Sequence, residues 1–149
     1  MARKRTALST SATLQFMRRL WDLAHALDVR SKQMAKTLGV TGPQRLVIRV
    51  VGQAPGCNAN EISTLLNLHP STLSGILSRL EAQGMLVRAK DPEDARRACF
   101  TLTGRGRAID RERKGTVEAA VRRALARADA ETVEEAAQMI DLLVEELVE

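Results

Sequence analysis

The stretch PSTLSGILSRLEAQG, residues 70–84, has the apolar spacing of an amphipathic helix and an unusually bare opposite face. Leucine and isoleucine recur three and four residues apart, which is the period of a helix with one buried side. The other side carries only small side chains, at Ser71, Gly75, Ser78 and Ala82. A glycine inside a helix costs roughly 1 kcal/mol relative to alanine. A large, rigid partner that approaches the helix backbone closely explains the missing bulk.

The segments on both sides of this helix predict a helix-turn-helix followed by a hairpin. Before it, a capping box at Asn58 opens a short helix over EISTLLN, and a tight turn at Leu68 and His69 follows. After it, Gly84 closes the helix, and residues 86–102 have the alternation of a β-hairpin with a charged tip at DPEDAR. This order of elements is a winged helix-turn-helix.

Longer helices are expected around this unit. Residues 11–38 have the pattern of one helix that stops at Gly39, and Thr41 begins a capping box for a second helix through RLVIRVV. Thr103 is expected to cap one further helix that continues past Val117, and Asp129 to cap the last helix. We therefore predict a mainly α chain of one structural domain with three regions: an N-terminal arm and helix at residues 1–40, the winged helix-turn-helix at 41–102 and C-terminal helices at 103–149.

Charge and composition narrow the class of partner. Residues 1–128 hold all 23 lysines and arginines and have a net charge of +13, whereas residues 129–149 hold no base and have a net charge of −8. A basic body attracts polyanions. One Trp, two Phe and no Tyr argue against stacking of single-stranded bases. Neither a membrane span nor the apolar segment of a signal peptide is visible, so a cytoplasmic protein without a membrane partner is expected.

Nine residues are candidates for contact with double-stranded DNA. The second helix of a helix-turn-helix enters the major groove, where hydroxyl groups can bond to bases and phosphates. Basic residues of a wing can lie along the backbone or enter the minor groove. The candidates are Ser71, Thr72, Ser74, Gly75, Ser78, Arg79, Lys90, Arg96 and Arg97. Two alternatives stay open: a helical adaptor whose bare face packs on a protein, and wing arginines that are merely solvated or paired with nearby acids.

Residues 44–107 resemble the MarR family of transcriptional regulators. LHPSTLSGILSRLEAQGMLVR is similar to the recognition helix and the start of the wing, DPEDARRACFTLT to the wing signature, and TGRGRAI to the opening of the next helix. Glu93 and Gly75 depart from the pattern, because the family often has arginine at both positions.

The resemblance implies a function and several residue roles. It implies a homodimer, formed by the N- and C-terminal helices, that binds a palindromic operator as a repressor or an activator, of which we favour the repressor. Arg96 would be the minor-groove arginine, with Asp91 and Asp94 orienting the wing. The basic arm at Arg3, Lys4 and Arg5 could meet the acidic tail across the dimer.

Many members of the family release DNA when a small aromatic or anionic effector binds between the dimer helices and the winged helix. Met17, Trp21 and His25 lie four residues apart and share a helix face, and Arg49 on the second helix could meet an anionic ligand there. These four residues are the candidate effector pocket. Ordinary core packing is the alternative for the same residues.

Redox sensing is an alternative, and enzymatic chemistry is not indicated. Cys57 precedes a helix N-terminus, which can lower a thiol pKa, so it is the candidate redox thiol, whereas Cys99 is expected to be buried. The alternative, which we favour, is that both cysteines are inert small residues, because neither matches a sensing position of the family. Glycine-rich phosphate loops, HExxH and GxSxG are absent, and His25, His69 and the cysteines lack metal-ligand spacing. We expect no catalysis, no cofactor and no metal.

Overall fold

A computed structural model describes residues 11–148 of the chain. The basic arm at residues 3–5 lies outside the described residues. The elements are α1 (Ala12–Thr37), α2 (Gly42–Gln53), β1 (Cys57–Asn58), α3 (Ala59–Leu66), α4 (Pro70–Ala82), β2 (Leu86–Lys90), β3 (Ala98–Leu102), α5 (Gly104–Arg111), α6 (Val117–Leu125) and α7 (Ala130–Val148).

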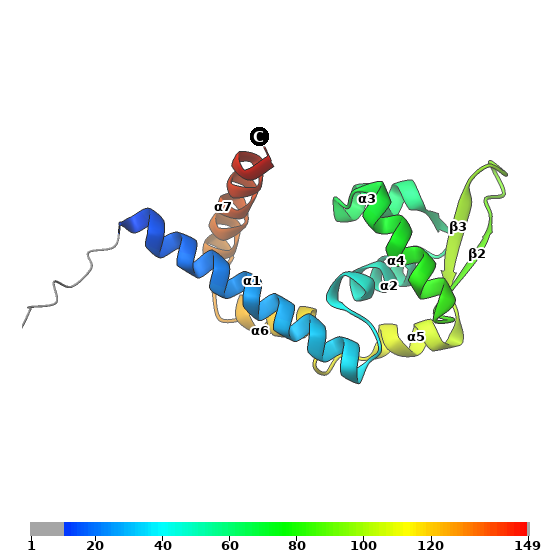
Figure 1. Cartoon of the computed structure of the whole chain (residues 1–149), viewed down its shortest axis with the longest axis horizontal. Coiled ribbons are helices and arrows are strands. Elements are labelled where there is room, and N and C mark those ends of the chain that lie inside the picture. The colour runs from blue at the N-terminus through cyan, green and yellow to red at the C-terminus, as the bar shows by residue number, and fades with distance from the viewer. Residues whose placement is uncertain (1–10, 149) are drawn as a thin grey trace, which may run out of the picture.

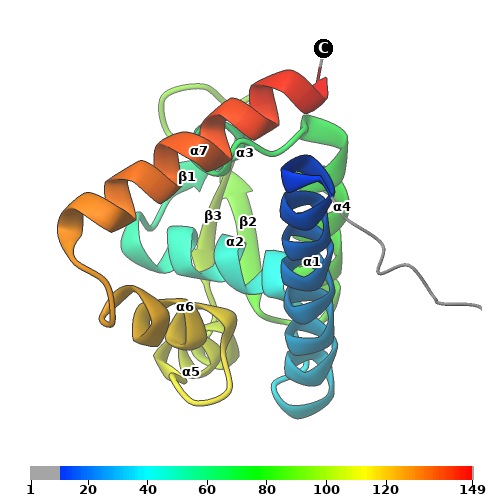
Figure 2. The same ribbon diagram turned by 90° about the vertical axis from the view of Figure 1, so that its left-hand side faces the viewer.

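The elements form a compact body with an extension on one side. Helices α2 to α5 and the small sheet make up the body, while α1, α6 and α7 extend away from it (Figures 1 and 2). The hairpin of β2 and β3 lies at the outer edge of the body beside α4 (Figure 1). The part that carries the predicted winged helix-turn-helix is therefore held apart from the long helices.

The predicted helix starts are confirmed by their caps. The side chain of Thr41 accepts a hydrogen bond from the backbone N–H of Gln44, and the Gln44 side chain accepts from the backbone of Thr41. Asn58 and Glu61 form the same reciprocal pair at the start of α3. Each capping box satisfies two backbone donors that the helix itself leaves unpaired.

The apolar face of α4 lies in the core, as its spacing predicts. Leu73, Leu77 and Leu80 are at most 2% exposed and pack in one cluster with residues of α2, α3 and the sheet. That cluster also contains Val47, Ile48, Val51, Ile62, Met85, Leu86, Phe100 and Leu102. Because the core fixes this face inward, the face with Gly75 points outward.

The sheet has one strand more than the predicted hairpin. β1 pairs antiparallel with β3, so that Cys57 lies opposite Phe100 and Asn58 opposite Cys99, and the strand order is β1-β3-β2. A strand of two residues is too short to show the alternation that identifies longer strands. The third strand joins the start of α3 to the wing.

The single helix predicted from Thr103 onward is wrong, because the chain turns between α5 and α6. Gly115 has a φ of 73°, in the left-handed region that favours glycine, and Thr116 accepts a hydrogen bond from the N–H of Ala119 to cap α6. The Glu112 carboxylate accepts from the backbone N–H groups of Arg113 and Lys114, which lowers the pKa of Glu112. The pair Gly115-Thr116 is the sequence signal for this break.

Candidate DNA-binding surface

The start of α4 is ordered by a histidine cap that the sequence did not indicate. The Nδ1 atom of His69 accepts from the backbone N–H of Ser71 at 3.2 Å, and the Ser71 hydroxyl lies 2.7 Å from the same atom. Pro70 occupies the first helical position, where its missing N–H is not needed. Of the predicted hydroxyls on α4, that of Ser71 is therefore already bonded within the chain.

The bare face of α4 is exposed in the structure. The six DNA candidates on this helix are all exposed: Ser71, Thr72, Ser74, Gly75, Ser78 and Arg79. A β-carbon built on Gly75 would have no heavy atom within 4 Å, leaving aside the backbone of its own helix and its chain neighbours. Among residues 11–148, no other element covers this face.

The tip of the wing is folded around two aspartates. Asp94 accepts hydrogen bonds from the backbone N–H of Arg96 at 3.0 Å and from its Nε at 3.3 Å, and its other carboxylate oxygen lies 3.6 Å from Nε of Arg97. These bonds to Arg96, together with the charge of Arg97, lower the pKa of Asp94. Asp91 accepts from the backbone N–H of Glu93 at 2.9 Å. The two aspartates thus shape the tip, which supports the role that the resemblance implies for them.

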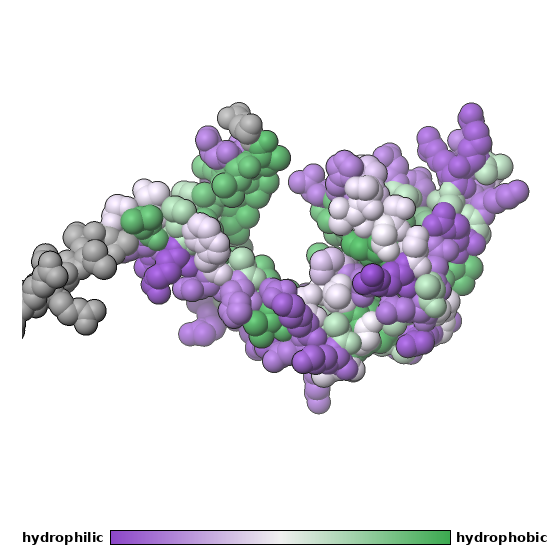
Figure 3. Space-filling view, in the orientation of Figure 1, coloured by the Kyte–Doolittle hydropathy of each residue, from purple (hydrophilic) through white to green (hydrophobic). Residues whose placement is uncertain are grey.

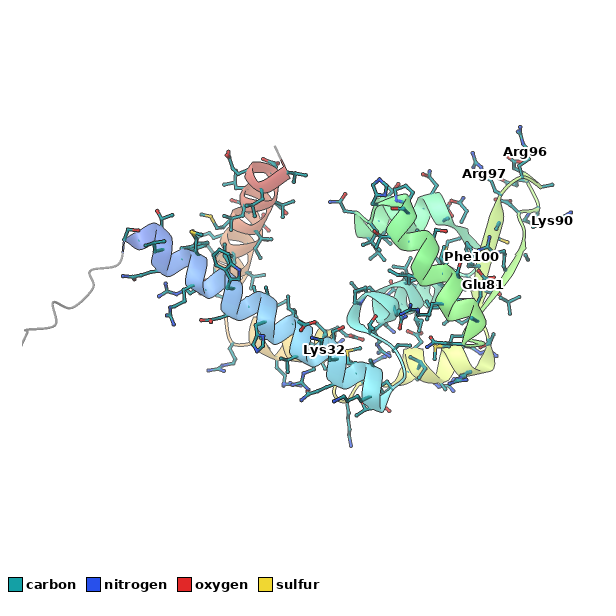
Figure 4. The ribbon with its side chains drawn as sticks, in the orientation of Figure 1. Lys32, Glu81, Lys90, Arg96, Arg97 and Phe100 are labelled. Atoms are coloured by element: carbon teal, nitrogen blue, oxygen red, sulfur yellow. The ribbon has the colours of Figure 1, made fainter. Side chains whose placement is uncertain are left out.

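The basic residues predicted for the wing remain accessible. Lys90, Arg96 and Arg97 are exposed, and the side chain of Arg96 is 92% exposed despite its bond to Asp94. Figure 4 shows all three projecting from the outer end of the hairpin. Arg96 and Arg97 do pair with a nearby acid, Asp94, as the alternative expected. Exposed ion pairs of this kind are weak, so both arginines remain available to a phosphate.

An ion pair that the sequence did not indicate joins α4 to the wing. Nη2 and Nε of Arg88 on β2 lie 2.7 and 3.1 Å from Oε1 of Glu81 on α4. The same guanidinium lies 5.1 Å from the ring centroid of Phe100. The pairing with Glu81 raises the pKa of Arg88. Figure 4 shows Glu81 and Phe100 close together between α4 and the hairpin. This contact links the wing to α4, beside the core packing of Leu86, Phe100 and Leu102.

A groove of about 470 Å³ runs between α4, the start of α3 and the wing. Arg88, Arg96 and Arg97 line it on the wing side, and Ser74 lines it on α4. Guanidinium groups bind phosphate through paired hydrogen bonds. On the side of α3, the groove is lined by three polar residues that were not predicted as site residues: Asn58, Asn60 and Ser63. These three residues could have been predicted, because the first helix of a helix-turn-helix crosses the DNA backbone.

The residues predicted for an effector pocket are not gathered around one cavity. Nη1 of Arg49 lies 2.7 Å from a carboxylate oxygen of Asp110 on α5, and Trp21 is 63% exposed. His25 is also exposed, and Met17 is half-buried. None of the four lines the cavity of about 530 Å³ that lies between α1, α2 and α6. That cavity is lined by Leu27, Asp28, Ser31, Gly42, Pro43, Leu46, Val117, Glu118 and Val121.

The structure does not support a reactive Cys57. Burial, and then the charge of Glu61, raise the pKa of the Cys57 thiol. Cys99 is half-buried, not buried as expected, and its Sγ donates to the carbonyl of Lys90 at 3.6 Å. No group of three metal-ligand side chains was found among residues 11–148.

A buried arginine connects the body to the extension. Arg45 on α2 is 0% exposed, and its Nε lies 2.6 Å from Oε1 of Glu118 on α6. The rest of its guanidinium donates to the backbone carbonyls of Ile109, Asp110 and Glu112 around the end of α5. Sequence patterns place arginine on surfaces by default, so this residue was not predicted.

Comparisons with known proteins agree with the predicted fold. The model of the MarR family matches residues 38–97. The HTH-type transcriptional repressor Rv2887 of Mycobacterium tuberculosis is 32% identical over 106 residues, which is 71% of this chain and 76% of the relative. A crystal structure of the S. aureus MepR-DNA complex superposes with a TM-score of 0.72 at 18% identity, covering 93% of this chain and 99% of that one.

A second solved structure is more similar in sequence. It is that of Rv2887 in complex with p-aminosalicylic acid, with 28% identity and a TM-score of 0.54 over 85% of this chain and 95% of that chain. The fold predicted from the sequence, a winged helix with flanking helices, is confirmed by these superpositions. No helix within residues 11–148 combines the length and the hydropathy that a membrane crossing requires. The chain belongs to the MarR family of winged helix transcriptional regulators.

Proposed function

We propose that this regulator is a repressor that binds a palindromic operator as a homodimer, with the bare face of α4 against the bases. The observation that carries this proposal is the exposed face around Gly75, which lies next to a groove lined by three arginines. A bulky, rigid polyanion fits such a surface better than a protein helix does. The wing and α4 together would span a base edge and the neighbouring phosphates.

Each part of the surface has a distinct role in this proposal. Thr72, Ser74 and Ser78 present hydroxyls to base edges in the major groove, and Arg79 contacts a phosphate or a base at the margin of the face. Arg96 enters the minor groove, where a narrow A/T-rich stretch attracts arginine. Lys90 and Arg97 neutralise phosphates, and contacts of this kind position the protein without reading sequence.

The long helices supply the argument for a homodimer. In α7 no described residue is buried, and its exposed hydrophobic side chains include Met139, Ile140, Leu142, Val144 and Leu147. Figure 3 shows a hydrophobic surface over α7. A contiguous apolar patch on the surface of a protein often marks an interaction surface. A second copy would cover α7 and α1 and place two α4 helices one DNA turn apart, roughly 34–36 Å.

The proposal also covers an effector, the location of the protein and redox sensing. A small effector in the cavity between α1, α2 and α6 would lower the affinity for DNA, since this cavity lies where the extension meets the body. The protein would act in the cytoplasm, in contact with DNA, and would perform no catalysis. The redox alternative lacks support from Cys57, because burial keeps its thiol protonated.

Enrichment of random duplexes by the purified protein tests the proposal. The expected result is a two-fold symmetric site that binds at least a thousandfold more tightly than random DNA. The dimer state is read on the same sample by sedimentation. Failure to enrich any duplex would refute DNA recognition, and enrichment by a monomer on a single half-site would refute the homodimer.

A further inference from the structure

The cavity between α1, α2 and α6 has apolar walls. Leu27, Leu46 and Val121 line it and are 43%, 48% and 45% exposed. Its volume of about 530 Å³ is within the range of small-molecule sites. An apolar body of a ligand would bury these side chains.

The charged side chains that line this cavity are all acidic. Asp28 on α1 and Glu118 on α6 are the two ionisable residues among its lining, and both are carboxylates. Nζ of Lys32 lies 2.6 Å from Asp28, but this is an exposed pair one helical turn apart, with side chains 72% and 54% exposed. Such exposed pairs contribute little to stability, so Asp28 can exchange its partner at little cost.

The base nearest to Glu118 cannot be reached by a ligand. The side chain of Arg45 is 1% exposed, whereas that of Glu118 is 24% exposed. No described lysine or arginine lines this cavity, so a ligand carboxylate inside it would face Asp28 and Glu118, and it would have to displace Glu118 to reach Arg45. A ligand cation could contact both carboxylates directly.

We propose that this cavity selects a small organic cation with an apolar body, such as an aryl-methylamine, over a carboxylate. This inference rests on the proposed function, in which an effector binds at this cavity. It sets the chain apart from its relative Rv2887, whose solved complex holds p-aminosalicylic acid. The residue that contacts the cation, Glu118, also holds Arg45 on α2, so binding acts directly on the contact that joins the extension to the body.

Titration calorimetry at pH 7 with four probes tests this proposal. The probes are 2-naphthylmethylamine, 2-naphthylmethanol, 2-naphthoate and p-aminosalicylate. We expect the amine to bind at least tenfold more tightly than either carboxylate. Asp28→Asn should weaken binding of the amine about tenfold and leave binding of the alcohol unchanged, since the substitution removes the negative charge that faces the ammonium and keeps a neutral acceptor.

The matched control is Asp22→Asn, because Asp22 forms the same kind of exposed pair on α1, with Arg18 at 3.7 Å, and does not line the cavity. Tighter binding of the carboxylates, an equal effect of both variants, or no binding of any probe would overturn the inference. Operator binding is measured separately without probe, so its failure would refute the proposed function and not the ligand preference.

Discussion

Substitution of Gly75 separates the stability of α4 from its proposed contact with DNA. In the free chain, a β-carbon at this position meets nothing within 4 Å outside its own helix backbone and neighbours, and the φ of Gly75 is not positive. Gly75→Ala therefore removes the helix penalty of glycine without strain. We expect a gain of about 0.8–1 kcal/mol in the free energy of unfolding, which raises Tm by roughly 2–4 °C in a chain of this length.

A large side chain at position 75 should weaken DNA binding even though it does not destabilise the free protein. Gly75→Leu replaces glycine with a good helix former, so the free protein should be at least as stable as the wild type. Its side chain, however, would stand between the helix and the bases. Overpacking a close contact costs about 1–3 kcal/mol, or roughly 5- to 150-fold in affinity.

Thermal unfolding and fluorescence anisotropy with the enriched operator measure the two effects. Gly104 in the first turn of α5 offers the matched control, because a β-carbon there meets only a guanidinium nitrogen of Arg107, at 3.8 Å. Gly104→Leu should leave operator affinity unchanged. If Gly75→Leu binds the operator as tightly as the wild type, the bare face does not lie against DNA and the reasoning fails.

Three further predictions concern the wing, the buried arginine and the thiol. Arg96→Ala should weaken binding to all duplexes and reduce the slope of log affinity against log salt concentration by about 0.9; an unchanged slope would argue against a phosphate-side contact. Arg45→Met should lower the free energy of unfolding, measured in urea, by about 3–5 kcal/mol, because Glu118 and three backbone carbonyls lose their partner. The control Arg19→Met, at an exposed position of α1, should change it by less than about 0.5 kcal/mol. Iodoacetamide should alkylate Cys57 more slowly at pH 7 in the folded protein than in urea, because burial raises its pKa and keeps the thiol protonated; equal rates would contradict this.

Local patterns predicted the body of the fold well. The spacing of Leu73, Leu77 and Leu80 identified which face of α4 is buried, and the boxes at Thr41 and Asn58 placed two helix starts. These signals depend on residues within one turn of each other, so they can be read from the chain directly. The exposure of the DNA candidates on α4 follows from the same reasoning.

Features that depend on distant residues were missed. Arg88 and Glu81 are seven residues apart on different elements, and their pairing depends on how the hairpin folds back on α4. Arg45 and Glu118 are 73 residues apart. Met17, Trp21 and His25 were chosen because they share one face of α1, but which cavity that face meets depends on where α6 packs. No local pattern carries that information.

The most direct test of the central claim is a dimethyl sulfate footprint of the protein on its enriched operator. This reagent methylates guanine N7, which faces the major groove where α4 is proposed to lie. The account predicts protection of guanines in two half-sites centred about one DNA turn apart, and loss of that protection in the Gly75→Leu variant. Full affinity with every major-groove guanine still reactive would contradict it.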